Sequence, residues 1–330
     1  MLNVGLLGCG RIGRVHGASL GRIEGARVAA VADAVPAAAQ ALAESCGAGA
    51  MPAADLIGSA GIDAVVIGTP TDTHYELIHA AAAAGKAILC EKPVDMSADR
   101  IRECMAAVEA AGVPFMTAFN RRFDPNFAAI AARIGAGEIG AVEIVTILSR
   151  DPAPPPPSYI AGSGGIFRDM MIHDFDMARF LLGEEPVSVY AVGAALVDPE
   201  IGEAGDVDTA AVTLTTPAGR ICQISNSRRA RYGYDQRVEV HGALGMLRAD
   251  NMLQDTVESA GADGFRRAPA QAFFLERYAA AYEAEMRHFV DCVASGRGVG
   301  PGIGDGLRAQ LLADAADLSR REGRVVRLTE

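Results

Sequence analysis

The feature that most constrains this chain is a glycine-rich turn directly after its first apolar run. Leu2–Leu7 is predicted to be a buried strand, Gly8-Cys9-Gly10-Arg11-Ile12-Gly13 follows it, and a helical pattern then continues to Leu20. Strand, Gly-x-Gly-x-x-Gly and helix, in this order, form the context of the dinucleotide-binding fingerprint. Its glycines allow a tight turn, close approach of a pyrophosphate, and close packing of helix on strand. An ordinary glycine-rich turn is the alternative interpretation.

An acidic residue in the expected place favours the fingerprint. A second strand, Arg27–Ala32, ends at Asp33, which lies 20 residues after Gly13. A carboxylate there can accept hydrogen bonds from ribose hydroxyls and would repel a 2′-phosphate, so NAD is favoured over NADP. The predicted cofactor contacts of this region are Gly8, Gly10, Arg11, Ile12, Gly13 and Asp33.

Strands and helices continue to alternate up to about residue 120. The later strand-like runs are Ile62–Gly68, Lys86–Cys90 and Val113–Ala118, with helical patterns at Thr73–Ala84 and Ala98–Ala111 between them. Repeated βα units of this length predict a doubly wound parallel sheet. Residues 1–120 are therefore expected to form an NAD-binding Rossmann domain.

Two strand ends carry polar residues at the carboxyl edge of this sheet, where ligands bind in such folds. The first is Thr69-Pro70-Thr71-Asp72-Thr73-His74, and the second is Glu91-Lys92-Pro93. A lysine in such a place can stabilise a developing alkoxide. The other interpretations are that Thr71 or Asp72 caps the next helix, that His74 has a structural role, and that Lys92 forms a surface ion pair. We expect further cofactor contacts from Thr69, Pro70, Thr71, His74, Glu91 and Lys92.

The organisation changes after Asn120. A helix that is opened by Arg121-Arg122-Phe123-Asp124-Pro125 and runs to about Ile134, and a strand at Gly140–Ser149, precede a proline run, Pro154–Pro157, which is expected to form a stiff loop. Strand-like runs follow without intervening helices, at Val187–Leu196, Thr209–Thr215, Arg220–Ser225 and Arg237–Gly242, and helices are expected at Phe274–Ala294 and Gly306–Arg321. Residues 121–330 are thus predicted to be an α+β substrate-binding and oligomerisation domain with a mainly antiparallel, open sheet.

One predicted helix of this second half carries ionisable residues at helical spacing. Asp169, His173 and Asp176 are separated by four and three residues in the segment that ends at Gly183. Side chains so spaced share a helical face, and an imidazole flanked by carboxylates can transfer protons near neutral pH. The alternative is helix-end electrostatics with a hydrogen-bonded structural histidine.

Composition excludes several classes of function. The formal net charge of −11 is dispersed, which disfavours nucleic acid and anionic membranes as partners. The six cysteines contain no C-x-x-C pair, and no apolar run is long enough to span a bilayer. We expect a soluble, cytoplasmic protein without a metal site or disulfides.

The quoted motifs together resemble the Gfo/Idh/MocA oxidoreductases. The shared elements are Gly8-x-Gly10-x-x-Gly13, Glu91-Lys92-Pro93 and Asp169-x-x-x-His173-x-x-Asp176. Four further segments resemble rhizobial-type members of the family that oxidise inositol: residues 119–125, 149–152, 164–182 and 225–235. The resemblance covers essentially the whole chain, and the second-half segments are its most specific part.

The resemblance implies an activity and a set of site residues. It implies NAD-dependent oxidation of the axial hydroxyl of myo-inositol to 2-keto-myo-inositol in inositol catabolism, by a homotetramer. Lys92, Asp169 and His173 would be the catalytic trio, with His173 as the base, and Asp176 would support them. By analogy the substrate contacts would be Lys92, Arg122, Asp151, Asp169, His173, Tyr232, Tyr234 and Tyr282.

Two other functions remain open from the sequence. A related dehydrogenase for scyllo- or chiro-inositol or an aldose would use the same chemistry in a different pocket. A non-enzymatic NAD-binding regulator would be expected to lack the lysine or the histidine, and both are present at Lys92 and His173.

Overall fold

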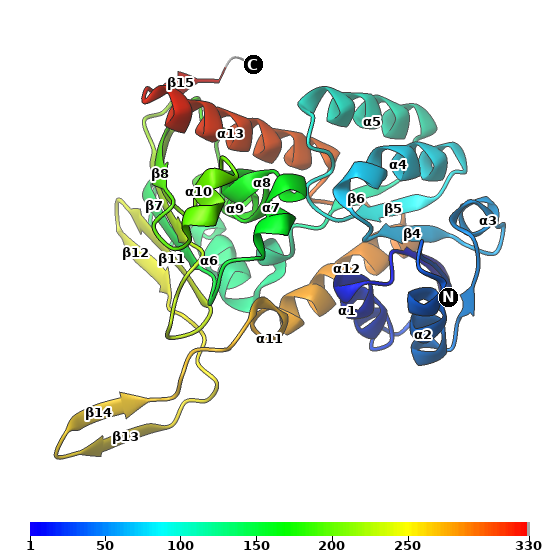
Figure 1. Cartoon of the computed structure of the whole chain (residues 1–330), viewed down its shortest axis with the longest axis horizontal. Coiled ribbons are helices and arrows are strands. Elements are labelled where there is room, and N and C mark those ends of the chain that lie inside the picture. Colours follow the sequence, from blue (N-terminus) through cyan, green and yellow to red (C-terminus); the bar gives the residue numbers. More distant parts are fainter. Residues whose placement is uncertain (329–330) are drawn as a thin grey trace. The chain divides into compact units, whose positions relative to one another are not determined.

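The computed structural model describes residues 1–328, which divide into two compact units (Figure 1). Unit 1 contains residues 1–123 and 280–310, and unit 2 contains residues 124–279 and 311–328. The change of unit after residue 123 lies close to the expected boundary at residue 120. The return of residues 280–310 to unit 1 has no counterpart in the sequence prediction.

Unit 1 is built on a six-stranded sheet with the strand order β3-β2-β1-β4-β5-β6, in which every pair is parallel. Its strands are β1 (Leu2–Leu7), β2 (Ala26–Ala32), β3 (Gly49–Ala50), β4 (Ala64–Ile67), β5 (Ala87–Cys90) and β6 (Phe115–Thr117). Its helices are α1 (Arg11–Leu20), α2 (Pro36–Cys46), α3 (Ala53–Gly58), α4 (His74–Ala83), α5 (Ala98–Ala111) and α12 (Ala279–Ser295), with 3₁₀ turns η1 (Thr71–Thr73) and η2 (Asn120–Phe123). This strand order is that of the Rossmann fold, so the predicted fold class is confirmed.

The core of unit 1 explains why α12 belongs to it. Buried residues of β1, β4 and β5, such as Leu6 and Leu89, pack in one cluster with Leu20 of α1. Met286 and Phe289 of α12 are fully buried in the same cluster. The apolar stripe of α12 thus covers the sheet face that α1 also covers, although α12 is encoded more than 150 residues after the last strand of the sheet.

Unit 2 is built on a seven-stranded sheet with the order β12-β11-β7-β10-β9-β8-β15. Its strands are β7 (Val142–Arg150), β8 (Ser188–Ala194), β9 (Thr209–Thr215), β10 (Ile221–Ser227), β11 (Asp235–Gly242), β12 (Gly245–Ala249) and β15 (Val326–Arg327). Only the pairing of β10 with β7 is parallel among these strands. The mainly antiparallel sheet is as predicted.

Helices pack on one face of this sheet, and α9 makes extensive contacts with β7. The helices are α6 (Pro125–Gly135), α7 (Pro157–Ser163), α8 (Gly165–Asp169), α9 (Ile172–Leu182), α10 (Pro199–Glu203), α11 (Phe274–Arg277) and the C-terminal part of α13 (Ile303–Glu322). The opposite face carries exposed apolar side chains, among them Ile144, Tyr190, Val192 and Met246.

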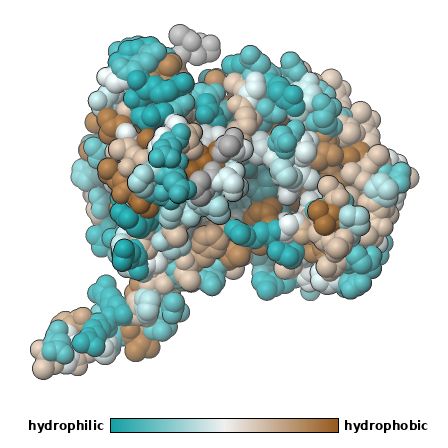
Figure 2. Space-filling model, in the orientation of Figure 1, coloured by the Kyte–Doolittle hydropathy of each residue, from teal (hydrophilic) through white to brown (hydrophobic). Residues whose placement is uncertain are grey.

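A hairpin of β13 (Glu258–Gly261) and β14 (Gly264–Arg267) extends from unit 2 and is seen at the lower left of Figures 1 and 2. All its residues are exposed, and its surface is mostly hydrophilic with Phe265 as an exposed apolar residue. Within the described residues, no helix is long and apolar enough to cross a membrane.

Two local predictions for unit 2 were wrong. The segment that carries Asp169 and His173 is not one helix, because α8 ends at Asp169 and α9 begins at Ile172. At the junction the N–H of Met171 donates to the carbonyl oxygen of Ile166, five residues back, which interrupts the regular ladder. The proline run is not wholly a loop either, since α7 begins at Pro157, where the missing N–H is not needed.

Candidate active site

The glycine-rich loop of unit 1 has the geometry that a dinucleotide requires. A Cβ at Gly8, where φ is +95°, would lie 2.5 Å from the carbonyl oxygen of Gly68, and one at Gly13 would lie 1.9 Å from that of Gly8. A Cβ at Gly10, the N-cap of α1, would meet nothing within 4 Å. Two glycines thus permit close packing, while the third leaves open space at the N-terminus of α1, where a pyrophosphate can bind.

Asp33 lies beside this loop at the end of β2. One carboxylate oxygen accepts a hydrogen bond from the N–H of Cys9 at 2.6 Å, and the other accepts one from the N–H of Val35 at 2.7 Å. The side chain is therefore held in place next to the loop that it is predicted to serve. Burial, with the Asp33 charge as a second cause, raises the pKa of the Cys9 thiol to about 11, so this cysteine stays protonated.

His74 joins the two polar strand ends of unit 1. Its Nδ1 is 3.0 Å from the carbonyl oxygen of Pro93, and its Nε2 is 3.0 Å from that of Thr69. Burial lowers the pKa of this imidazole below its usual value, so that it is neutral near pH 7. His74 therefore ties the loop after β4 to the loop after β5. The capping role considered for Thr71 and Asp72 is wrong, because the N-cap of α4 is Thr73 and no side chain caps it.

Lys92 is the second residue after β5 and is partly exposed. Its peptide bond to Pro93 is cis, and its backbone N–H donates to a carboxylate oxygen of Glu91 at 3.2 Å. Two of the predicted substrate contacts lie elsewhere in unit 1. Arg122 donates to Asp305 at 2.8 Å, and the ring of Tyr282 packs edge-on against His16.

Asp169, at the end of α8 in unit 2, is held from two sides. Both terminal nitrogens of Arg228 donate to its Oδ2 at 3.2 Å, and the hydroxyl of Tyr159 donates to its Oδ1 at 3.1 Å. The side chain of Arg228 is 2% exposed, and that of Asp169 is 18% exposed. A buried arginine therefore fixes the orientation of a carboxylate that still reaches solvent.

His173 lies in the first turn of α9 and is partly exposed. The next residue, Asp174, is fully buried and accepts hydrogen bonds from Ser149 Oγ of β7 at 2.7 Å and from Asn226 Nδ2 of β10 at 2.8 Å. These bonds fasten the first turn of α9 to the sheet and so position His173. The sequence patterns did not indicate Asp174, because it is one of several ionisable residues in the segment that forms α9.

Asp176 lies one turn further along α9. Its side chain is 1% exposed, and its Oδ1 is 3.5 Å from a terminal nitrogen of Arg179, which also binds Glu185. The expected helical relationship between His173 and Asp176 is present, since both belong to α9. Asp176 thus carries a partly compensated charge in the interior of unit 2.

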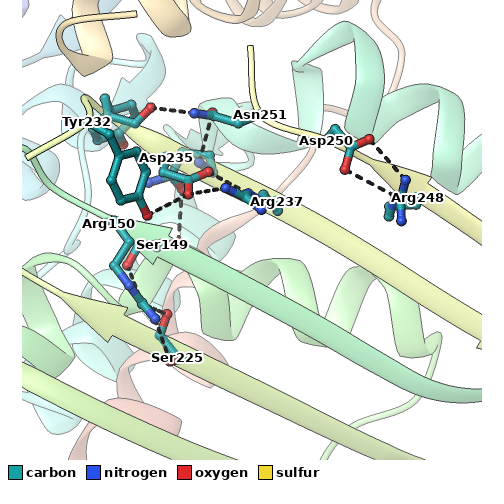
Figure 3. Close-up of polar contacts among 11 residues, drawn as sticks. Ser149, Arg150, Ser225, Tyr232, Asp235, Arg237, Arg248, Asp250 and Asn251 are labelled. Carbon is teal, nitrogen blue, oxygen red and sulfur yellow. Dashed lines mark hydrogen bonds and ion pairs between the residues drawn. The ribbon is translucent and has the colours of Figure 1, made fainter. Parts of the chain in front are cut away.

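A further polar cluster lies where β7, β10 and β11 meet (Figure 3). The buried carboxylate of Asp235 accepts from the hydroxyl of Tyr232 at 2.9 Å and from Arg237 at 2.8 Å, while Arg150 donates to Ser225 Oγ at 2.9 Å. The side chain of Tyr232 remains largely exposed at this end of the strands.

The other predicted contacts of this region differ in exposure. The backbone N–H of Asp151 donates to the carbonyl oxygen of Ser227 at 3.0 Å, which places this residue directly after β7. Tyr234 is 4% exposed and packs edge-on against Phe273 and Tyr278. Of the two tyrosines, Tyr232 offers its surface to solvent and Tyr234 is part of an aromatic cluster.

Known proteins match this chain over its whole length. The model of the oxidoreductase family with an NAD-binding Rossmann fold matches residues 2–119, and that of the GFO/IDH/MocA C-terminal domain matches residues 127–248. The inositol 2-dehydrogenase of Rhizobium meliloti is 53% identical over 98% of both chains. The chain belongs to the GFO/IDH/MocA oxidoreductase family. Its N-terminal domain is thus an NAD-binding domain, as predicted from the glycine loop and Asp33.

Two solved structures of this family extend the comparison. A myo-inositol dehydrogenase from Corynebacterium glutamicum is 45% identical with a TM-score of 0.96, covering 100% of this chain and 99% of that one. The myo-inositol dehydrogenase of Lactobacillus casei in complex with NAD(H) and myo-inositol is 26% identical with a TM-score of 0.89, covering 100% of this chain and 97% of that one. Structures of GFO/IDH/MocA members named inositol dehydrogenases thus share the fold of both units.

Proposed function

We propose that this protein is an inositol 2-dehydrogenase that oxidises the axial hydroxyl of myo-inositol to 2-keto-myo-inositol with NAD, in the catabolism of inositol. The observation that carries the proposal is the match to a relative named inositol 2-dehydrogenase across both units. The oriented carboxylate of Asp169 and the fastened first turn of α9, which carries His173, support it.

The chemistry assigned to the residues follows from their types and partners. We propose that His173 takes the hydroxyl proton at an imidazole nitrogen, because an imidazole titrates near neutral pH. The ammonium of Lys92 stabilises the oxygen as it gains negative charge. Asp169, held by Arg228, orients the imidazole or a neighbouring hydroxyl. Bound NAD supplies the acceptor for the hydride that leaves the same carbon.

The remaining site residues are proposed to contact the substrate. Binding the hydroxyls of a polyol needs many hydrogen-bond donors and acceptors, and we assign this role to Arg122, Asp151, Tyr232, Tyr234 and Tyr282. The cofactor contacts are those predicted from the sequence, at the glycine loop, Asp33 and the two strand ends joined by His74. Sites that bind hydroxyls in this way can reject an epimer steeply, because buried partners are left unpaired.

Initial rates with NAD test the choice of substrate. We expect kcat/KM to be highest for myo-inositol in a comparison with scyllo-inositol, chiro-inositol and glucose. The lowest kcat/KM of the four for myo-inositol would refute the proposed substrate. A higher value for scyllo-inositol alone would identify a related dehydrogenase with the same chemistry.

The preference for NAD depends on Asp33 in this proposal. We expect Asp33→Ala to raise the ratio of kcat/KM with NADP to that with NAD by about tenfold or more, because the carboxylate that repels a 2′-phosphate is removed. Asp63→Ala, which removes an exposed carboxylate that also accepts a backbone N–H, is the matched control. A wild-type preference for NADP would contradict the assignment.

A homotetramer and a cytoplasmic location complete the proposal. The exposed apolar side chains Ile144, Tyr190, Val192 and Met246 share one face of the seven-stranded sheet and suit a second copy of the chain. The cysteines are all free thiols, which fits a reducing compartment. Light scattering of the purified protein measures the mass of the assembly, and a monomeric mass would refute the tetramer.

A further inference from the structure

Next to Lys92, unit 1 contains a cluster of buried ionisable side chains that includes Glu91, so far considered only as a cofactor contact. His16 of α1, Glu91 after β5 and Glu285 of α12 are each at most 9% exposed. The Nε2 of His16 lies 2.9 Å from Oε1 of Glu91. The other oxygen of Glu91, Oε2, accepts the backbone N–H of Lys92 at 3.2 Å. The carboxylate of Glu91 therefore connects the helix behind the glycine loop to the peptide of Lys92.

The surroundings of His16 show which of its two ring nitrogens carries the hydrogen in the bond to Glu91. Its Nδ1 is buried and has no hydrogen-bond partner among the described residues, and the ring of Tyr282 packs edge-on at 5.9 Å. A buried N–H without an acceptor costs more than a bare lone pair next to a ring. Nε2 therefore carries the hydrogen and donates it to Glu91.

Glu285 is the unusual member of the cluster. It is fully buried, and within the described part of the chain neither of its carboxyl oxygens has a hydrogen-bond partner. Burial, and secondarily the negative charge of Glu91, raises the pKa of Glu285 well above its ordinary value. The protonated, neutral form of Glu285 is thus favoured. Glu91, in contrast, has two hydrogen-bond donors, His16 and the backbone N–H of Lys92.

We propose that Glu91 is a positioning residue for Lys92: its carboxylate, anchored by His16, holds the Lys92 peptide and places a negative charge beside the lysine. This inference rests on the proposed function, in which Lys92 contacts the reacting oxygen. The ionisable groups around the Glu91 carboxylate are Cys90 of β5, His16 from α1, His74 from α4, Glu285 from α12, and Lys92 itself, with Tyr282 of α12 against His16.

An opposite charge nearby favours the charged form of an amine. Removal of the Glu91 charge therefore lowers the pKa of Lys92 and frees the peptide that carries it. Because Glu285 is neutral, its replacement by glutamine leaves the charge of the cluster unchanged. Glu91→Gln and Glu285→Gln are thus a matched pair of substitutions with the same change of atoms and different expected results.

The sequence makes a direct measurement at Lys92 simple, because Lys86 and Lys92 are its only lysines. Lysine labelled with ¹³C at Cε gives two NMR signals in the NAD-bound protein, and Lys92→Met identifies the signal of Lys92. Lys86 is buried, donates to the carbonyl oxygens of Ser59 and Ile62 at 2.7 Å, and serves as the internal reference. The signals are followed from pH 8 to pH 11.

We expect Glu91→Gln to lower the pKa of Lys92 by about half a unit or more and to lower kcat by about tenfold. The Lys86 signal should stay close to that of the wild type. Glu285→Gln should leave the pKa of Lys92 unchanged and kcat within about threefold of the wild type. Glu91→Asp keeps the negative charge but shortens the side chain, so kcat should fall with little change in the pKa of Lys92.

An unchanged Lys92 pKa in Glu91→Gln would overturn the inference, and so would an equal loss of kcat in Glu285→Gln. If Glu91→Gln does not fold, wild-type kcat in Glu91→Asp would overturn the positioning role. A wild-type protein that oxidises none of the inositols would refute the proposed function, whereas the shift of the Lys92 signal would still test the role of Glu91.

Discussion

Replacing His173 with alanine is expected to lower kcat for myo-inositol by about 10²–10⁴-fold, the usual loss when a general base is removed. An imidazole ordinarily has a pKa near neutral, which suits a general base, and Asp174 fastens the first turn of α9 to β7 and β10. The Kd for NAD should change little, because NAD is assigned to the glycine loop and strand ends of unit 1. Steady-state rates and fluorescence titration with NADH measure the two quantities.

A control for this result is available on the surface of unit 2. His241 of β11 is more than half exposed beside Glu143, and His241→Ala should retain wild-type kcat. Full activity of His173→Ala would refute the assignment of the base. If the wild type bound NAD but oxidised no polyol, the result would favour the regulatory alternative considered from the sequence.

Replacing Asp169 with alanine is expected to reduce the free energy of unfolding by about 3–5 kcal/mol in addition to impairing turnover. Arg228 is 2% exposed, and both of its terminal nitrogens donate to Asp169. Without the carboxylate, a buried guanidinium loses its charge partner, which is the costly outcome for a buried ion pair. Urea unfolding at a fixed protein concentration measures the loss.

The double variant Asp169→Ala/Arg228→Met separates the two effects. A methionine fills much of the space of the arginine and carries no charge, so most of the lost stability should return. Activity should not return, because Asp169 is still absent. Asp263→Ala, in the exposed hairpin, should match the wild type in both measurements. A wild-type unfolding midpoint for Asp169→Ala would show that Arg228 does not depend on Asp169.

The parts of the fold that the sequence predicted correctly are those determined by neighbouring residues. The glycine spacing from Gly8 to Gly13, the acidic residue at the end of β2 and the alternation of strands and helices all act over a few residues. Helix α5 and strand β9 have the predicted bounds, because each is bordered by local stop signals such as Gly112. The break between α8 and α9 was missed, because the spacing of Asp169 and His173 is equally compatible with one continuous helix.

By itself, the sequence determined the NAD-binding domain, the classes of the two sheets and the residue types that can move a proton. These depend on backbone restrictions at glycines and on the period of apolar residues, which are properties of short segments. Only the tertiary structure decided that α12 completes the core of unit 1, that Arg228 and Tyr159 hold Asp169, and that Glu285 is buried beside Glu91. The partners of a buried charge come from elements distant in the chain, and their packing selects which of many charged residues meet.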